Sequence, residues 1–174
     1  MGAELCVESE YGKGSTFALT GAFPAFAVVS EKDSERAERM TALKARCAGL
    51  RALVVDDDIT AQDLATVLLH RLGCEVDRAH DGLVCLEQAA ARHYDLVIMD
   101  WHLPNLDGLA TLAELRRLED YHDVPVLAVT AKAQESDREA CLEAGMCGYI
   151  AKPLDVDAFY SELQNCLMAE RCAG

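Results

Sequence analysis

The chain has 174 residues, enough for one domain and an appendage, and 51% of them are hydrophobic. Its formal net charge of −14 argues against a nucleic-acid surface, which needs clustered lysine and arginine, and against attraction to anionic lipid. We find no signal peptide and no apolar stretch long enough to span a bilayer, so the sequence predicts a soluble chain without membrane contact.

The eight cysteines form no CxxC pair and no cluster with zinc spacing. Most of them fall at apolar positions of predicted helices or strands, where a free cysteine behaves as a small hydrophobic residue. We therefore expect reduced, structural thiols in a reducing compartment, with a redox sensor as the alternative.

Residues 1–29 form the first segment. Residues 5–9 and 16–19 alternate like strands around the turn sequence YGKG, which predicts a hairpin. A lone hairpin is marginal in water, so this segment resembles a piece of a larger domain.

Residues 30–49 are rich in charge and form the second segment. Met40, Leu43 and Cys47 recur at helical spacing, and Gly49 would end the helix. We predict a solvated linker helix. The alternative is a short coiled-coil seam between two protomers of a homodimer.

Residues 50–174 alternate between strand and helix. Apolar runs predict strands at 52–56, 74–78, 95–99, 125–129 and 147–151. Helical spacing predicts helices at 59–72, 82–92, 108–118, 135–144 and 156–170. Strands joined by helices of this length make βαβ units, so the fold class is α/β: one doubly wound domain with a five-stranded parallel sheet and five helices.

Four of the apolar runs end in residues that can bind a metal ion or a phosphoryl group. These residues are Asp56 and Asp57 after RALVV, Asp100 after YDLVIM, Thr130 after VPVLAV and Lys152 after CGYIA. Ligands of an open α/β sheet bind beyond the carboxyl ends of its strands. Three carboxylates, a hydroxyl and an amine gathered there fit a Mg²⁺-dependent site that handles a phosphoryl group.

The motifs LVVDDD, VIMDWHLPNLDG, VLAVTA and GYIAKP resemble those of response-regulator receiver domains, in the same order and at the same spacing. The resemblance runs from residue 50 to about residue 172 and implies the strand order 2-1-3-4-5. It also implies that Asp57 and Asp100 are Mg²⁺ ligands, that Asp56 holds the ion through water, and that the backbone carbonyl of His102 completes the protein ligands.

The same resemblance assigns the chemical roles. Asp100 would attack a phosphohistidine and become an acyl phosphate. Lys152 would neutralise the phosphoryl oxygens, and the Thr130 hydroxyl would then move to the new phosphoryl group. Tyr149 occupies the aromatic switch position of the family, and the alternative is that it is simply a half-buried strand residue.

Two further positions of the receiver family are occupied by His102 and Lys132, which follow Asp100 and Thr130 by two residues. The resemblance implies that they flank the path of water to the acyl phosphate and modulate its lifetime. Asp58 and Asp107 are expected to be helix caps and not ligands.

The amino-terminal sequence MGAELCVESEYGKGSTFALT is similar to the end of the ATP-binding domain of sensor histidine kinases. The matching residues are Gly2, Val7, Ser9, Gly12, Gly14, Ser15 and Phe17. The resemblance divides the chain into an incomplete remnant of that domain (1–29), a linker helix (30–49) and a receiver (50–174). No nucleotide-binding motif is present, so we expect no kinase activity, only self-phosphorylation and autodephosphorylation of the receiver.

The two resemblances together imply the receiver of a hybrid sensor histidine kinase in a phosphorelay. Its expected partners are the phosphohistidine and dimerisation domain of the kinase and a histidine phosphotransfer protein. The receiver would lie in the cytoplasm, even if the full-length kinase is anchored in the membrane.

Other functions remain open at this point. Asp56 and Asp58 also fit the Asp-x-Asp-x-Thr motif of haloacid-dehalogenase-like phosphatases, although that leaves Asp100 and the WHLPNLDG loop unexplained. A pseudo-receiver that binds a partner without phosphorylation normally lacks an acid, the threonine or the lysine, and all are present here. A flavodoxin-like cofactor binder lacks support, because an acidic pocket would repel a flavin phosphate.

Overall fold

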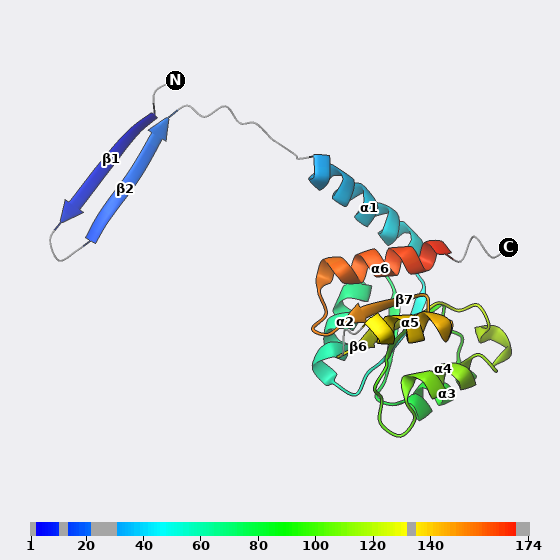
Figure 1. Cartoon of the computed structure of the whole chain (residues 1–174). Helices are drawn as coiled ribbons and strands as arrows, with labels where there is room; N and C mark the ends of the chain where they lie inside the picture. Colours follow the sequence, from blue (N-terminus) through cyan, green and yellow to red (C-terminus); the bar gives the residue numbers. More distant parts are fainter. Residues whose placement is uncertain (1–2, 11–13, 22–30, 132–134, 170–174) are drawn as a thin grey trace. The chain divides into compact units, whose positions relative to one another are not determined.

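The structure is a computed structural model that describes residues 3–10, 14–21, 31–131 and 135–169 (Figure 1). The chain divides into two compact units, Met1–Arg36 and Ala37–Gly174, which are described separately. Among the helices that the structure describes, none is both long and apolar enough to cross a membrane.

The first unit contains an antiparallel hairpin. Strand β1 (Ala3–Glu10) pairs with strand β2 (Gly14–Gly21) in a register that runs from Ala3 opposite Gly21 to Glu10 opposite Gly14. The predicted strands are confirmed, and each is longer than the alternating pattern indicated. The predicted turn falls on residues 11–14, of which 11–13 lie outside the described residues.

The second unit is built on a five-stranded parallel sheet. Its strands are β3 (Arg51–Val55), β4 (Glu75–Ala79), β5 (Leu96–Asp100), β6 (Val126–Thr130) and β7 (Gly148–Ala151). They lie in the order β4-β3-β5-β6-β7, and every neighbouring pair is parallel. This is the predicted order 2-1-3-4-5. The central strands read as unbroken apolar runs because both faces of the sheet are covered.

Helices connect the strands and cover both faces. They are α1 (Glu31–Cys47), α2 (Ile59–Arg71), α3 (Gly82–Ala91), α4 (Gly108–Leu115), α5 (Glu135–Glu143) and α6 (Val156–Ala169), with a 3₁₀ turn η1 (Glu119–Tyr121). Strand β3 shows how the layers form, since Ala52 and Val54 face a core shared with α2 and α6, while Leu53 and Val55 face a core shared with α3, α4 and α5.

The helix predicted at 108–118 is three residues shorter than expected. After Leu115, the amides of Arg117 and Leu118 bond to carbonyls three residues back, so the helix tightens and ends. The Arg116 guanidinium then donates to the carbonyls of Tyr121 and Val124, at 2.6 and 2.7 Å, and so holds the connection to β6.

Helix α1 confirms the predicted helix but not its solvation. Leu43 and Cys47 are buried in the core between α2 and α6, and Met40 packs against that core. The Arg46 guanidinium donates to the carbonyl of Leu167 in α6. The expectation of a solvated linker is therefore wrong for the last turns of α1, whose apolar stripe is buried against its own receiver.

Two of the cysteines meet in the fold. Cys147, just before β7, and Cys166 in α6 lie within disulfide distance, with their Cα atoms 5.1 Å apart, whereas the sequence predicts reduced thiols. Four others are free and buried, as expected: Cys47, Cys74, Cys85 and Cys141. The side chain of Cys6 and all of Cys172 lie outside the described residues.

Candidate functional site

Three carboxylates meet at the carboxyl end of the sheet. Asp56 and Asp57 directly follow β3, and Asp100 is the last residue of the neighbouring strand β5. One oxygen from each side chain lies within 4.8 Å of the others. Asp56 and Asp100 are buried, whereas Asp57 is exposed. The cluster is therefore open to solvent on one side and closed on the other.

Lys152 directly follows the edge strand β7, and its side chain reaches the two buried carboxylates at the same end of the sheet. Its Nζ lies 2.9 Å from the Asp56 carboxylate and 2.7 Å from Asp100 Oδ2. The backbone amide of Lys152 donates to the carbonyl of Thr130 at 2.7 Å, and the Lys152–Pro153 peptide is cis. The ammonium thus bridges the ends of β3 and β5.

Burial and hydrogen bonding oppose each other in this cluster. Desolvation raises the pKa of Asp56, against the hydrogen bonds from Lys152 and from the amide of Asp58. Burial alone would lower the pKa of Lys152, but its hydrogen bonds to Asp100 and Asp56 outweigh that effect and raise it. One ammonium among three carboxylates leaves an excess of negative charge, and a divalent cation with oxygen ligands would offset it.

The loop after β5 approaches Asp100 closely. The amide of His102 donates to Asp100 Oδ1 at 3.0 Å. A Cβ atom on Gly108 would lie 2.6 Å from the Asp100 carbonyl oxygen, so only glycine lets α4 begin this close to the strand. Asp107 caps α4 by accepting from the amide of Ala110, which confirms its predicted structural role.

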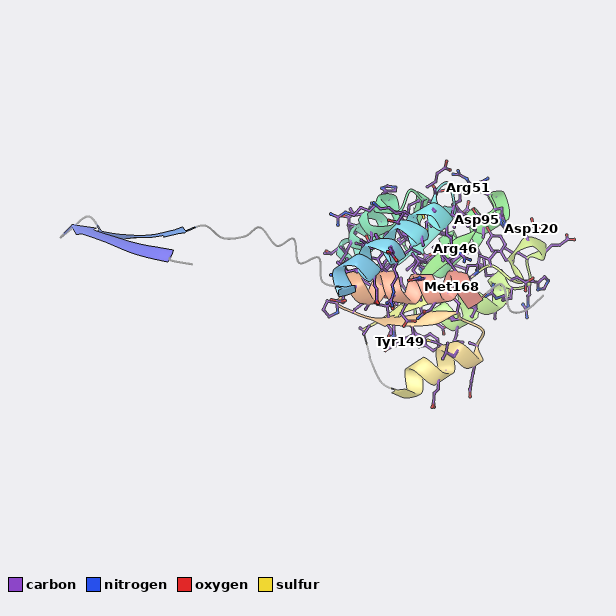
Figure 2. The ribbon with its side chains drawn as sticks, turned by 90° about the horizontal axis from the view of Figure 1, so that it is seen from above. Arg46, Arg51, Asp95, Asp120, Tyr149 and Met168 are labelled. Carbon is purple, nitrogen blue, oxygen red and sulfur yellow. A yellow bond between two sulfur atoms is a disulfide. The ribbon has the colours of Figure 1, made fainter. Side chains whose placement is uncertain are left out.

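Thr130 and Tyr149 lie on the two strands beyond β5. Thr130 ends β6 and is fully buried, with its backbone paired to Ala151 of β7. Tyr149 is half-buried on β7 and projects toward α5 (Figure 2). His102 is exposed beside the cluster, and Lys132 lies outside the described residues.

Asp58 does not join the carboxylate cluster. It is exposed and caps α2 by accepting from the amide of Thr60, as predicted. Sequence reasoning missed Gln62, which is buried in the first turns of α2 and donates to the carbonyls of Asp56 and Ala79. A glutamine near a helix start carries no local signal for this role, because one of its partners lies 17 residues away.

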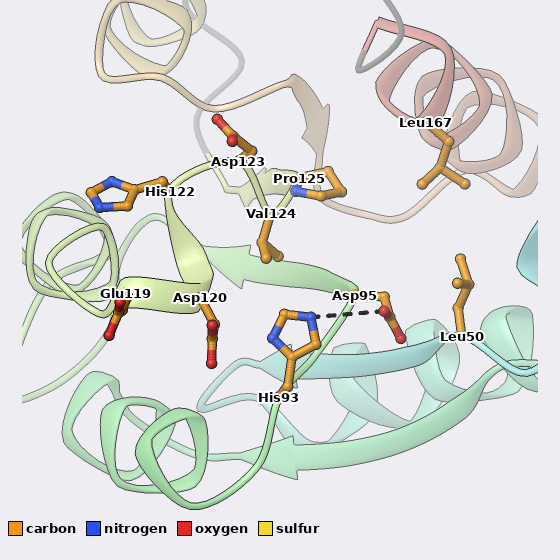
Figure 3. Close-up of a pocket in the computed structure, with 10 residues that line it drawn as sticks. All are labelled: Leu50, His93, Asp95, Glu119, Asp120, His122, Asp123, Val124, Pro125 and Leu167. Carbon is orange, nitrogen blue, oxygen red and sulfur yellow. Dashed lines mark ion pairs between the residues drawn. The ribbon is translucent and has the colours of Figure 1, made fainter. Parts of the chain in front are cut away.

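The opposite end of the sheet carries an acidic pocket of about 380 Å³ (Figure 3). Its polar lining comprises His93, Asp95, Glu119, Asp120, His122 and Asp123. His93 Nε2 lies 3.8 Å from the Asp95 carboxylate, but the six side chains do not form a group with metal-ligand spacing. Among the side chains that the structure describes, the carboxylates of Asp56, Asp57 and Asp100 form the one group with metal-ligand spacing.

Residues 52–164 match the family described as the response regulator receiver domain. This range contains the three carboxylates of the cluster. The chain belongs to this family. The matched range includes Asp56, Asp57, Asp100, Thr130 and Lys152, and an acidic cluster of this kind is typical of the magnesium site of the family. The haloacid-dehalogenase alternative loses its basis, because Asp58 serves as a helix cap.

The receiver is similar to segments of longer sensor proteins. Sensor protein EvgS of Escherichia coli O157:H7 is 34% identical over 165 residues, and Aerobic respiration control sensor protein ArcB of Escherichia coli (strain K12) is 37% identical over 165 residues. Both alignments cover 95% of this chain, but only 13% of EvgS and 20% of ArcB. The chain thus spans a small part of these relatives.

Among solved structures, the receiver is similar to that of sensor histidine kinase PA1611 from Pseudomonas aeruginosa PAO1, which has a magnesium ion coordinated in its active site cleft. The two are 37% identical with a TM-score of 0.63, and the match covers 70% of this chain and 99% of that domain.

Proposed function

We propose that Asp100 is the phosphoacceptor of this receiver. The observation that carries the proposal is the position of its carboxylate, which lies 2.7 Å from the Lys152 ammonium and within 4.8 Å of two further acids. The opposite carboxylate oxygen accepts the amide of His102. Both oxygens are thereby held in place at the end of a rigid central strand.

The chemistry follows from that position. One Asp100 oxygen attacks the phosphorus of a phosphohistidine, so that an O–P bond forms while the P–N bond breaks and the imidazole leaves. Lys152, already paired with Asp100, can transfer its interaction to the incoming phosphoryl oxygens. The buried Thr130 hydroxyl would then bond to the phosphoryl group, and Tyr149 would follow inward.

The charge and the donors of the cluster fit Mg²⁺. Asp57, Asp100 and the His102 carbonyl would hold the ion directly, and Asp56 through water. A bound Mg²⁺ would supply the positive charge that the phosphoryl oxygens require in the transition state. His102 and Lys132 would flank the path of the hydrolytic water and so adjust the lifetime of the acyl phosphate.

We further propose that the receiver belongs to a hybrid histidine kinase and passes its phosphoryl group to a histidine phosphotransfer protein. Because 165 of the 174 residues align with EvgS and ArcB, the similarity includes most of the amino-terminal segment 1–29. This similarity supports that segment as part of a kinase ATP-binding domain, and we propose a cytoplasmic location for the receiver.

The test is phosphorylation by acetyl phosphate with Mg²⁺, read by intact mass. The wild-type chain should gain one phosphoryl group and Asp100→Asn none, while the matched variant Asp58→Asn should label normally. Labelling of Asp100→Asn would refute the assignment. A wild-type chain that never labels, from acetyl phosphate or from a phosphorylated histidine kinase, would identify a pseudo-receiver.

A further inference from the structure

The loop of residues 101–107, here called the acceptor loop, joins Asp100 to α4 and contains the His102 backbone. Two backbone hydrogen bonds brace it, from Leu106 to the Pro104 carbonyl and from Gly108 to the Trp101 carbonyl. Asn105 has a φ of 63° and is the one non-glycine residue with positive φ among the described residues. Asparagine tolerates this left-handed conformation better than most residues, but the backbone alone does not favour it.

An acid from another element secures that turn. Asp81, between β4 and α3, is buried, and one of its oxygens caps α3 by accepting from the amide of Val84 at 2.8 Å. Its other oxygen accepts from Asn105 Nδ2 at 2.9 Å, across 24 residues of sequence. Asparagine would cap the helix about as well, so capping alone does not account for a buried charge here.

The start of α3 also packs directly on the acceptor loop. A Cβ atom on Gly82 would lie 2.6 Å from the Leu106 carbonyl oxygen. The Thr111 hydroxyl in α4 donates to the carbonyl of Asp107 at 2.8 Å. The acceptor loop therefore packs against the start of α3, and the Asp81–Asn105 pair is a charge-assisted hydrogen bond across that contact.

We propose that Asp81 and Asn105 are a positioning pair that holds the acceptor loop, and with it the His102 backbone, in the geometry that binds Mg²⁺. The inference rests on the proposed metal site. Neither residue touches the ion. The pair acts through the loop, because the His102 amide donates to Asp100, and the carbonyl of the same residue is the backbone ligand proposed above.

Three variants of the full chain test the pair, with Mg²⁺ titrated against Trp101 fluorescence and calorimetry. Asn105→Gly keeps the left-handed turn but removes the amide, and should raise the Kd for Mg²⁺ by about threefold to tenfold. Asn105→Asp places a second carboxylate against Asp81 and should weaken binding further. The double variant Asp81→Asn/Asn105→Asp exchanges the two groups and restores a donor and an acceptor, so its Kd should return to within about twofold of wild type.

The outcomes separate positioning from plain stability. A role in stability alone would lower the melting temperature of Asn105→Gly and leave its Kd unchanged, and this would overturn the pair. A double variant that binds as weakly as Asn105→Asp would overturn it as well. If the wild-type chain itself binds no Mg²⁺, both the pair and the metal site fall, whereas equal binding by wild type and Asn105→Gly removes only the pair.

Discussion

Both ends of the receiver sheet are acidic, but only one of them builds a site. At the carboxyl end, Asp56, Asp57 and Asp100 converge within 4.8 Å around the Lys152 ammonium. At the amino end, four acids line an open pocket without converging. One of them, Asp95, is used for structure, since it accepts the amide of Arg51 at 2.8 Å (Figure 2).

The direction of the chain explains the difference. At the carboxyl end each strand leads into the start of a helix, whose free amides and positive dipole end favour anions. Asp58, Asp81 and Asp107 all cap helices there. At the amino end the strands follow helix carboxyl ends, which disfavour gathered carboxylates. The number of acids therefore does not identify a site, whereas their convergence at helix starts does.

The largest expected effect comes from Lys152. Lys152→Met should slow phosphorylation of Asp100 by roughly 100- to 1000-fold, because it removes a preorganised charge from the transition state. Mg²⁺ should bind this variant more tightly, since a competing positive charge is gone. Lys44→Met, an exposed lysine of α1, is the control and should behave as wild type. Rapid phosphorylation of Lys152→Met by acetyl phosphate would show that the ammonium does not act in transfer.

The next largest effect is expected on the affinity for Mg²⁺. Asp57→Ala should weaken Mg²⁺ binding by at least the roughly 10- to 100-fold that loss of outer-shell partners causes. Asp120→Ala, in the pocket at the amino end, removes an equal charge and should leave the Kd unchanged. Titration of both variants by Trp101 fluorescence compares the two ends directly. Equal weakening by both would mean that overall charge, and not convergence, holds the ion.

A pair of truncations tests how much helix α1 contributes to the stability of the receiver. Removal of residues 1–48 withdraws Leu43 and Cys47 from the core and should lower the melting temperature by about 5–10 °C. Removal of residues 1–36 should not, because that cut falls at the boundary of the two units. Both proteins should still be phosphorylated on Asp100. If the proteins lacking residues 1–48 and residues 1–36 melt at the same temperature in thermal scans, α1 does not contribute to the stability of the receiver.

The smallest expected effect concerns pH and Asp81. The amide of Val84, and next the side chain of Asn105, lower the pKa of Asp81 below its ordinary value of about 3.9. The ionised form is favoured in the folded state, so its contribution is complete above about pH 4 and is lost as the pH falls through the lower folded pKa. The stability gap between wild type and Asp81→Asn in urea melts should persist from pH 7 to 5, where protonation of His80, 3.9 Å from Asp81, can only add to it, and should close toward pH 3. A gap that persists at pH 3 would contradict this.

Most of the fold could be read from the sequence for a physical reason. Strands buried on both faces must be apolar along their whole length, so β3, β5 and β6 were found within a residue of their ends. The carboxylates, Thr130 and Lys152 follow such runs directly. The helix predicted at 108–118 was overextended, because its end depends on Arg116 reaching distant carbonyls.

The α/β class, the strand positions and the residues available for chemistry follow from the sequence, because they depend on hydrophobic period and on which residues directly follow a strand. Three contacts become visible only in the folded chain: the stripe on α1 packs against its own receiver, Cys147 meets Cys166, and Asp81 holds Asn105. Each of these contacts joins segments that are distant along the chain. A local sequence pattern indicates that a side chain will be buried or hydrogen-bonded. Which residue it contacts depends on the segments that the folded backbone brings close to it.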